Sequence, residues 1–198
     1  MSRRFIAAFG EDAAHRMVVG ALIAKVANEE GVAVRVDWRS ARGGHPRVSS
    51  ELREYLRDLT LQREQPDLVV VATDANCKGA AQRTSELPLD RAPVNVVLAM
   101  PDPHIERWLL VDGAAFKSVL GHGCAAPDQK CARDRYKGLL LQAVIDAGVE
   151  PSLGGIEYAE DLVAAMDLER STAADASLRR FVEDLRRSLR AISRSSTR

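Results

Sequence analysis

The sequence feature that most constrains the fold is a continuous run of apolar, mostly β-branched residues within PDLVVVATD, at 66–74. A strand with one face in water alternates apolar and polar residues, whereas this run leaves no side for solvent. It therefore predicts a strand in the interior of a parallel sheet, covered by helices on both faces. The segment APVNVVLAM at 92–100 repeats the pattern and predicts a second such strand.

The N-terminal part of the chain adds two strands and the helices between them. Residues 12–30 carry apolar side chains at helical spacing up to Gly31, and a second helix follows the Gly- and Arg-rich loop at 41–50, with Ser49 or Ser50 as its N-cap. Alternating strands and helices predict an α/β fold with a mainly parallel four-stranded sheet flanked by helices. We expect the strands near residues 4–9, 32–38, 67–73 and 94–100.

The rest of the chain, from about residue 104, is expected to be mostly helical. Its last helix, roughly 177–192, places apolar residues on one face and arginines on the other. The apolar face either closes the core or contacts a partner, and the cationic face either binds phosphate or a partner or is simply solvated. We divide the chain into an α/β core at 1–112 and a helical C-terminal part at 113–198, packed on the same domain.

Composition excludes several classes of protein. Apolar residues make up 46% of the 198, too many for a disordered chain, and the 28 basic residues are balanced by 28 acidic ones, which excludes a uniformly basic nucleic-acid coat protein. The three cysteines have no disulfide-framework spacing, which favours a reducing compartment. No apolar run approaches the roughly 18 residues of a membrane span. We therefore expect a cytoplasmic protein that does not enter the membrane.

Acidic residues follow three of the predicted strands. Glu11 follows the first, Asp74 ends the third, and Glu106 lies shortly after the fourth. In a parallel sheet these ends meet at one edge, where carboxylates repel one another unless a cation lies between them. Mg²⁺ prefers such hard oxygen ligands and suits phosphoryl-transfer chemistry. The alternative is that these acids only cap helices or solubilise loops.

These motifs resemble a known family. A strand ending in Gly-Glu, a helix, and a strand ending in Asp-x-Asn resemble the Toprim domain of topoisomerases, primases and OLD-family nucleases. The stretch MPDPHIERWLLVD at 100–112 is similar to the Pro-x-x-x-Ile-Glu-x-Trp-Leu motif of small stand-alone Toprim-like proteins, typically encoded beside ATPases in bacterial defence loci. Residues 155–169 and 177–189 resemble that family's closing helices, so the resemblance covers nearly the whole chain.

The resemblance implies roles for individual residues. Glu11 matches the Toprim glutamate, a metal ligand or general base, and Asp74 matches the first Asp of the Asp-x-Asp pair. Asn76 stands where the second Asp is usual, so the implied site for Mg²⁺ or Mn²⁺ lacks one negative charge. His15, which is expected on the same helical face as Glu11, replaces an acid that family members often carry.

Two further positions complete the implied site. Glu106 matches the family's later glutamate, and a late lysine often neutralises phosphate in Toprim nucleases. Both Lys130 and Lys137 are candidates for this lysine, and we favour Lys137 because RYKGLLLQAV is expected to begin a helix near the sheet edge. The catalytic set implied by the resemblance is therefore Glu11, Asp74, Glu106 and Lys137.

The resemblance implies a Mg²⁺-dependent nuclease of a defence-type system that works with an ATPase partner. The alternative is a catalytically weakened Toprim-like subunit that binds an ATPase or nucleic acid without cutting. A purely structural assembly protein is a third interpretation. The sequence leaves open whether the substrate is DNA or RNA, and whether the chain forms an oligomer.

Other residues are interpreted as structural. Trp38 and Trp108 are expected in the core. A zinc site made by His122, Cys124 and Cys131 lacks the usual ligand spacing, and ordinary loop thiols are the alternative. Arginines around the loop at 41–50 either contact a nucleic-acid backbone or form a solvated charged loop; they are Arg39, Arg42 and Arg47.

Overall fold

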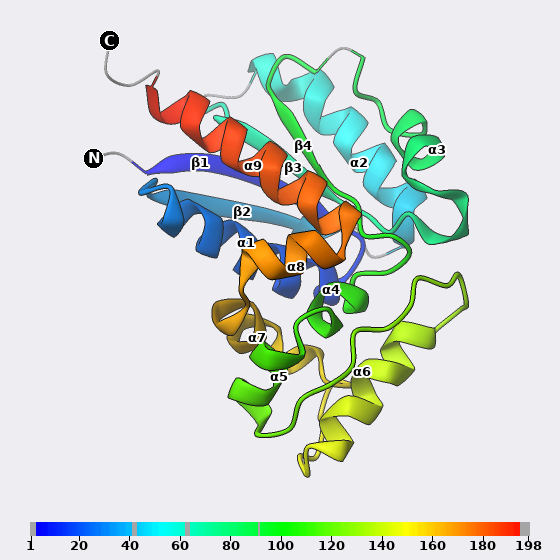
Figure 1. Cartoon of the computed structure of the whole chain (residues 1–198). Helices are drawn as coiled ribbons and strands as arrows, with labels where there is room; N and C mark the ends of the chain where they lie inside the picture. Colours follow the sequence, from blue (N-terminus) through cyan, green and yellow to red (C-terminus); the bar gives the residue numbers. More distant parts are fainter. Residues whose placement is uncertain (1–2, 41–42, 62–63, 91, 195–198) are drawn as a thin grey trace.

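Four parallel strands form one sheet in the order β2-β1-β3-β4 (Figure 1). The computed structural model describes residues 3–40, 43–61, 64–90 and 92–194. Every pair of neighbouring strands is parallel, so the α/β fold predicted from the sequence is confirmed. The strands are β1 (Arg4–Gly10), β2 (Val34–Ser40), β3 (Leu68–Ala72) and β4 (Val96–Ala99).

The two central strands are buried because helices cover both of their faces. Ile6 and its neighbours on one face pack with α1 (Ala13–Glu29) and α9 (Ala176–Arg194), whereas Phe9 and its neighbours on the other face pack with α2 (Gly44–Asp58). All five residues of β3 are buried, as the unbroken apolar run predicts. Strand β2 lies at an edge, where every second side chain is exposed, including Arg35, Asp37 and Arg39.

The C-terminal helices share the core of the sheet. Figure 1 shows α9 lying across the sheet on the side of α1, with α4 to α7 grouped in the lower part of the view. Phe181 of α9 is fully buried and stacks on Trp108, with ring centroids 5.7 Å apart. The other helical elements are η1 (Leu59–Leu61), η2 (Asn76–Lys78), α3 (Ala80–Ser85), α4 (Glu106–Leu110), α5 (Gly113–Leu120), α6 (Arg135–Asp146), η3 (Ile156–Tyr158), α7 (Ala159–Ala165) and α8 (Leu168–Ala174).

The apolar face of α9 is not available to a partner. Its side chains have no exposed surface at five positions: Leu178, Phe181, Val182, Leu185 and Leu189. This face therefore closes the core, which was one of the two alternatives.

Among the helices of the described part of the chain, none combines the length and apolar character needed to cross a bilayer.

The predicted loop at 41–50 is wrong from residue 44 onward, because α2 begins at Gly44. Ser49 therefore lies inside the helix and caps nothing; its hydroxyl donates a hydrogen bond to the carbonyl oxygen of Glu86 (3.0 Å). Gly43, with φ of 137°, turns the chain into the helix, and Pro46 is tolerated because the first turn needs no N–H donor there. The first turn of this helix has no apolar residues at helical spacing, so the sequence pattern does not indicate a helix there.

The two tryptophans differ in burial. Trp108 has no exposed surface, as expected. Trp38 is only half-buried because β2 is an edge strand, and it packs against α1 where Gly20 leaves room for the ring.

Candidate functional site

A pocket of about 250 Å³ lies beyond the carboxyl ends of β1 and β3. It brings together the positions that the sequence analysis assigned to metal binding or catalysis, from four separate segments of the chain. The strand ends predicted a common site for Glu11, Asp74 and Glu106, and the family resemblance added Asn76 and Lys137; the structure places all five around one cavity. Its lining residues are Glu11, Asp12, Asp74, Asn76, His104, Glu106, Arg133, Asp134, Tyr136 and Lys137.

Glu11 lies in the tight turn that joins β1 to α1. Asp12 is the N-cap of α1, and its carboxylate accepts a hydrogen bond from the backbone N–H of His15 (3.1 Å). Glu11 therefore precedes the helix, and the expectation that it shares a helical face with His15 is wrong. Its Oε1 accepts hydrogen bonds from the Thr73 hydroxyl and from the backbone N–H of Asp74 (3.2 Å).

Asp74 is placed by backbone hydrogen bonds that continue the β3–β4 pairing past the strand ends. The N–H groups of Thr73, Ala75 and Asn76 donate to the carbonyls of residues 99, 101 and 103, at 2.8 to 3.0 Å. This pairing brings residue 74 beside His104 and Ile105. Asn76 adopts a left-handed backbone conformation (φ 49°), which Asn and Asp tolerate better than most residues.

Both carboxylate oxygens of Asp74 have donors. Oδ1 accepts from Nε2 of His15 (3.1 Å) and from the backbone N–H of Ile105 (3.0 Å), while Oδ2 accepts from Nδ1 of His104 (3.1 Å). Burial works against the charged form of Asp74, but the hydrogen bonds from His104 and His15 outweigh it and lower its pKa. Asp74 is therefore ionised and held from three directions.

His15 is a buried cation between two carboxylates. Its side chain is 1% exposed, and Nδ1 lies 2.8 Å from Oδ1 of Asp12 while Nε2 faces Asp74. Burial opposes its charge, yet the hydrogen bonds to Asp12 and Asp74 raise its pKa to about 10. Asp12 is also opposed by burial, but its contacts with His15 lower its pKa to about 2. Both ring nitrogens are therefore protonated at neutral pH.

Two other acids of the pocket, Glu11 and Glu106, have the opposite shift. Burial raises the pKa of Glu11 and of Glu106, and the negative charge of Asp74 raises both further. Glu106 is the first residue of α4 and is 4% exposed. Two carboxyls near an ionised Asp74 thus resist losing their protons, which is typical of acid–base groups and of cation sites.

Lys137 reaches the pocket from the first turn of α6. Helix α6 begins at Arg135, close to where the sequence analysis expected it. Tyr136 beside it is buried, and its hydroxyl fixes the preceding loop through the carbonyl of Asp128 (2.9 Å). The alternative Lys130 does not line the pocket and instead forms an ion pair with Asp128 (2.9 Å).

Sequence reasoning missed five residues that line the pocket: Asp12, His104, Arg133, Asp134 and Tyr136. An Asp directly before a helical pattern is an N-cap signal, so Asp12 could have been identified from sequence. His104 lies within the stretch MPDPHIERW, but its contact with Asp74 spans 30 residues and depends on the backbone pairing beyond β3. No local pattern indicates that contact.

The zinc alternative is not supported by the cysteines. Cys124 is a free thiol that donates weakly to the carbonyl of Leu110 (3.8 Å), and Cys131 takes part in a disulfide. The disulfide was not expected, so the cysteines no longer favour a reducing compartment. Within the part of the chain that the structure describes, no three His, Cys, Asp or Glu side chains are gathered into a metal-ligand group.

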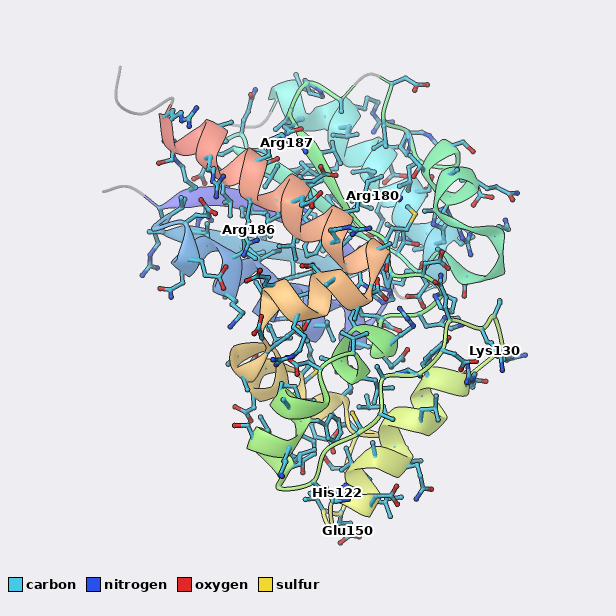
Figure 2. All side chains as sticks on the ribbon, viewed as in Figure 1. His122, Lys130, Glu150, Arg180, Arg186 and Arg187 are labelled. Carbon is cyan, nitrogen blue, oxygen red and sulfur yellow. The ribbon has the colours of Figure 1, made fainter. Side chains whose placement is uncertain are left out.

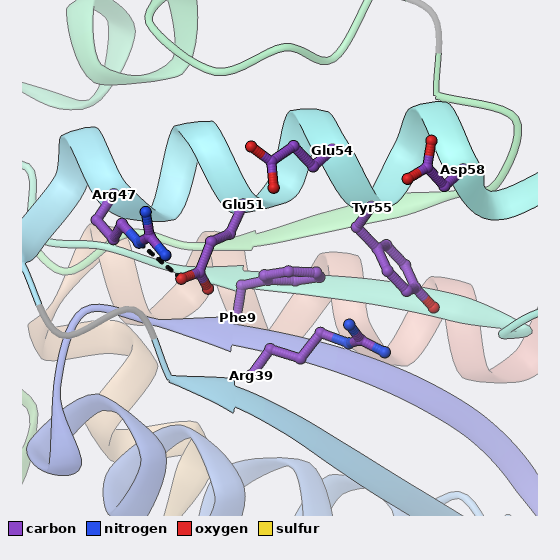
Figure 3. Close-up of a pocket in the computed structure, with 7 residues that line it drawn as sticks. All are labelled: Phe9, Arg39, Arg47, Glu51, Glu54, Tyr55 and Asp58. Carbon is purple, nitrogen blue, oxygen red and sulfur yellow. Dashed lines mark hydrogen bonds and ion pairs between the residues drawn. The ribbon is translucent and has the colours of Figure 1, made fainter.

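The arginines of the 41–50 region line a different pocket, of about 350 Å³ (Figure 3). Arg47 forms an ion pair with Glu51 (2.8 Å), and the Arg39 guanidinium lies 4.6 Å from the centre of the Tyr55 ring. Two more carboxylates, Glu54 and Asp58, line the same hollow. This charge balance disfavours a nucleic-acid backbone there and favours the solvated charged region that was the alternative. Arg42 lies outside the described residues.

Comparison of the chain with protein-family models, curated proteins and solved structures found no match. Function is therefore inferred from the geometry of the pocket around Glu11 and Asp74 and from the sequence motifs of the chain.

Proposed function

We propose that this chain is a Toprim-like nuclease that hydrolyses phosphodiester bonds with Mg²⁺ or Mn²⁺. The observation that carries the proposal is the convergence of Glu11, Asp74, Asn76, Glu106 and Lys137 on one pocket. Among the residues that line the pocket, Glu11, Asp74 and Glu106 carry carboxylates and Asn76 carries an amide oxygen, the ligand types that a hard cation prefers. The raised pKa of Glu11 and Glu106 also fits, since a cation between the acids would relieve their repulsion.

In this proposal Glu11, Asp74 and Asn76 hold the metal ion. When bound, such an ion lowers the pKa of a water molecule and stabilises charge on the phosphate. Glu106, buried at the start of α4 with a raised pKa, retains a proton at neutral pH more readily than an exposed Glu and is suited to general acid–base work. Lys137 is exposed at the rim and is placed to pair with a phosphate oxygen of the substrate.

A second candidate is favoured by the histidines around Asp74. His15 and His104 already occupy both carboxylate oxygens, so a metal ion has to compete with them for this ligand. Asn76 is neutral, so the site lacks the negative charge that an Asp would supply there. A Toprim-like subunit that binds nucleic acid or an ATPase without cutting is consistent with such a site.

Calorimetry with Mg²⁺ and Mn²⁺, together with cleavage assays on DNA and RNA, separates the two candidates. The nuclease proposal expects metal uptake and cleavage in the wild type, with cleavage reduced more than 100-fold in Asp74→Asn. Asp161→Asn, an exposed carboxylate on α7, is the matched control and should cut like the wild type. Metal uptake without any cleavage, or no uptake at all, supports the second candidate and overturns the first.

Asn76→Asp extends the same assay in the other direction. Asp tolerates the left-handed backbone of this position and adds the missing charge. The nuclease proposal expects tighter Mg²⁺ binding, because each added carboxylate strengthens a hard-cation site. Unchanged affinity would place the metal away from Asn76.

We also infer an ATPase partner from the family resemblance. The surface available for it is the outer, Arg-rich face of α9, where Arg180 and Arg187 are exposed (Figure 2). Arg186 and Arg190 form ion pairs with Glu29 and Glu30 of α1, and Arg187 pairs with Asp184 on its own helix.

A further inference from the structure

His45 is a buried side chain that the proposed chemistry does not use. It lies in the first turn of α2, in the Gly-His-Pro segment at 44–46, and is 4% exposed. Its Nδ1 is 2.8 Å from the hydroxyl oxygen of Thr73, and its Nε2 is 3.1 Å from Oε2 of Glu86. The ring therefore lies between the end of β3 and the acid that follows α3, but Nε2 has no hydrogen-bond partner among the described residues.

The direction of these hydrogen bonds follows from the contact on the pocket side. The Thr73 hydroxyl has a single proton, which it donates to Oε1 of Glu11. Its oxygen must then accept from His45, so Nδ1 carries a proton. Three side chains, Glu11, Thr73 and His45, thus form a continuous hydrogen-bonded chain from the pocket to the first turn of α2.

The outer end of this chain is held in place by burial. His45 is 4% exposed in the first turn of α2, and Thr73 has no exposed surface. These surroundings leave the Thr73 hydroxyl with a fixed orientation. Glu11, by contrast, lies in a short turn and has one other hydrogen bond in the described contacts, from the Asp74 backbone.

We propose that Thr73 and His45 are positioning residues, which hold the Glu11 carboxylate in the orientation that the site requires. The inference rests on the proposed nuclease function and extends it. Groups that orient a ligand or an acid–base residue typically change affinity or activity 10- to 100-fold when removed. In this proposal the Gly-His-Pro segment has a role in the site, because its histidine orients the Thr73 hydroxyl.

The test compares Thr73→Val, which keeps the shape but removes the hydroxyl, with Thr73→Ser, which restores it. We expect Thr73→Val to lower kcat by about 10- to 100-fold, with KM within about twofold of the wild type. Thr73→Ser should recover kcat to within about threefold, and His45→Gln should behave like Thr73→Val. Thr172→Val on α8, whose hydroxyl bonds only to its own helix, is the matched control and should leave kcat unchanged.

The outcomes distinguish this inference from the function on which it rests. An active wild type whose Thr73→Val and His45→Gln variants keep full kcat overturns the positioning role alone. Loss of fold in both variants, measured by circular dichroism, also overturns it in favour of a structural role; if only Thr73→Val fails to fold, His45→Gln decides. A wild type that neither binds metal nor cleaves overturns the nuclease proposal and this inference with it.

Discussion

At the scale of single residues, His15 is a positive charge of the protein itself that lies between two carboxylates of the pocket. It is almost fully buried between Asp12 and Asp74, and these contacts raise its pKa from 6.5 to about 10. A group whose pKa is raised by folding stabilises the folded state fully below its unfolded pKa. That stabilisation is lost as the pH rises from about 6.5 to about 10.

We therefore predict that the free energy of unfolding of the wild type falls between about pH 7 and pH 10. In His15→Gln the contribution of the imidazole to this fall should be absent. Urea midpoints measured at intervals across the range provide the check. His122→Gln removes an exposed histidine and should keep the wild-type slope. A wild-type slope in His15→Gln would show that the imidazole is not charged in the fold.

Asp74 has a structural role as well as its proposed chemical one. Asp74→Ala removes the acceptor for Nε2 of His15, Nδ1 of His104 and the N–H of Ile105. A buried donor left without a partner costs about 1–3 kcal/mol, so we expect the free energy of unfolding to fall by about that amount. Chemical denaturation measures the change, with the exposed Asp161→Ala as control. A variant more stable than the wild type would mean that repulsion between Asp74 and Glu11 dominates.

At the scale of elements, two helical glycines should respond oppositely to the same substitution. A Cβ on Gly113, at the start of α5, would lie 2.2 Å from the carbonyl oxygen of Cys124, so the backbone must shift. A Cβ on Gly138, inside α6, meets nothing within 4 Å.

We expect Gly113→Ala to destabilise by about 1–3 kcal/mol through overpacking. Gly138→Ala should stabilise by about 0.5–1 kcal/mol, because glycine loses more backbone entropy in a helix than alanine. Denaturation curves of the two variants supply the comparison. Changes of the same sign would contradict the packing of α5 against residue 124.

The elements also show how far the sequence could predict this fold. Strand β3 was predictable because burial on both faces leaves a continuous apolar run, and Glu11 and Asp74 were predictable because strand ends meet at one edge. The start of α2 was not, since Gly43, Gly44 and Pro46 carry no helical periodicity. The contacts of Asp74 with His15 and His104 depend on tertiary pairing, which no local pattern contains.

At the scale of the whole molecule, the C-terminal helices should unfold together with the sheet. Helix α9 fills the core beside α1, and Trp108 stacks on Phe181 while Trp38 reports on β2. Each tryptophan can be followed alone, Trp108 in the Trp38→Phe variant and Trp38 in the Trp108→Phe variant. We predict that in each variant the tryptophan fluorescence and the circular dichroism give the same denaturation curve. Earlier loss of the Trp108 signal would indicate that residues 113–198 unfold separately.

The position of β2 at the edge of the sheet has a consequence for aggregation. An edge strand offers unpaired backbone groups on which another chain can add a strand. Arg35, Asp37 and Arg39 line the exposed side of β2 with charge, and Arg35 also lies over the Phe5 ring, 4.2 Å from its centre. A second copy that pairs with this edge has to desolvate those charges. The strand is therefore protected against fibril-like stacking by side chains instead of by a covering helix.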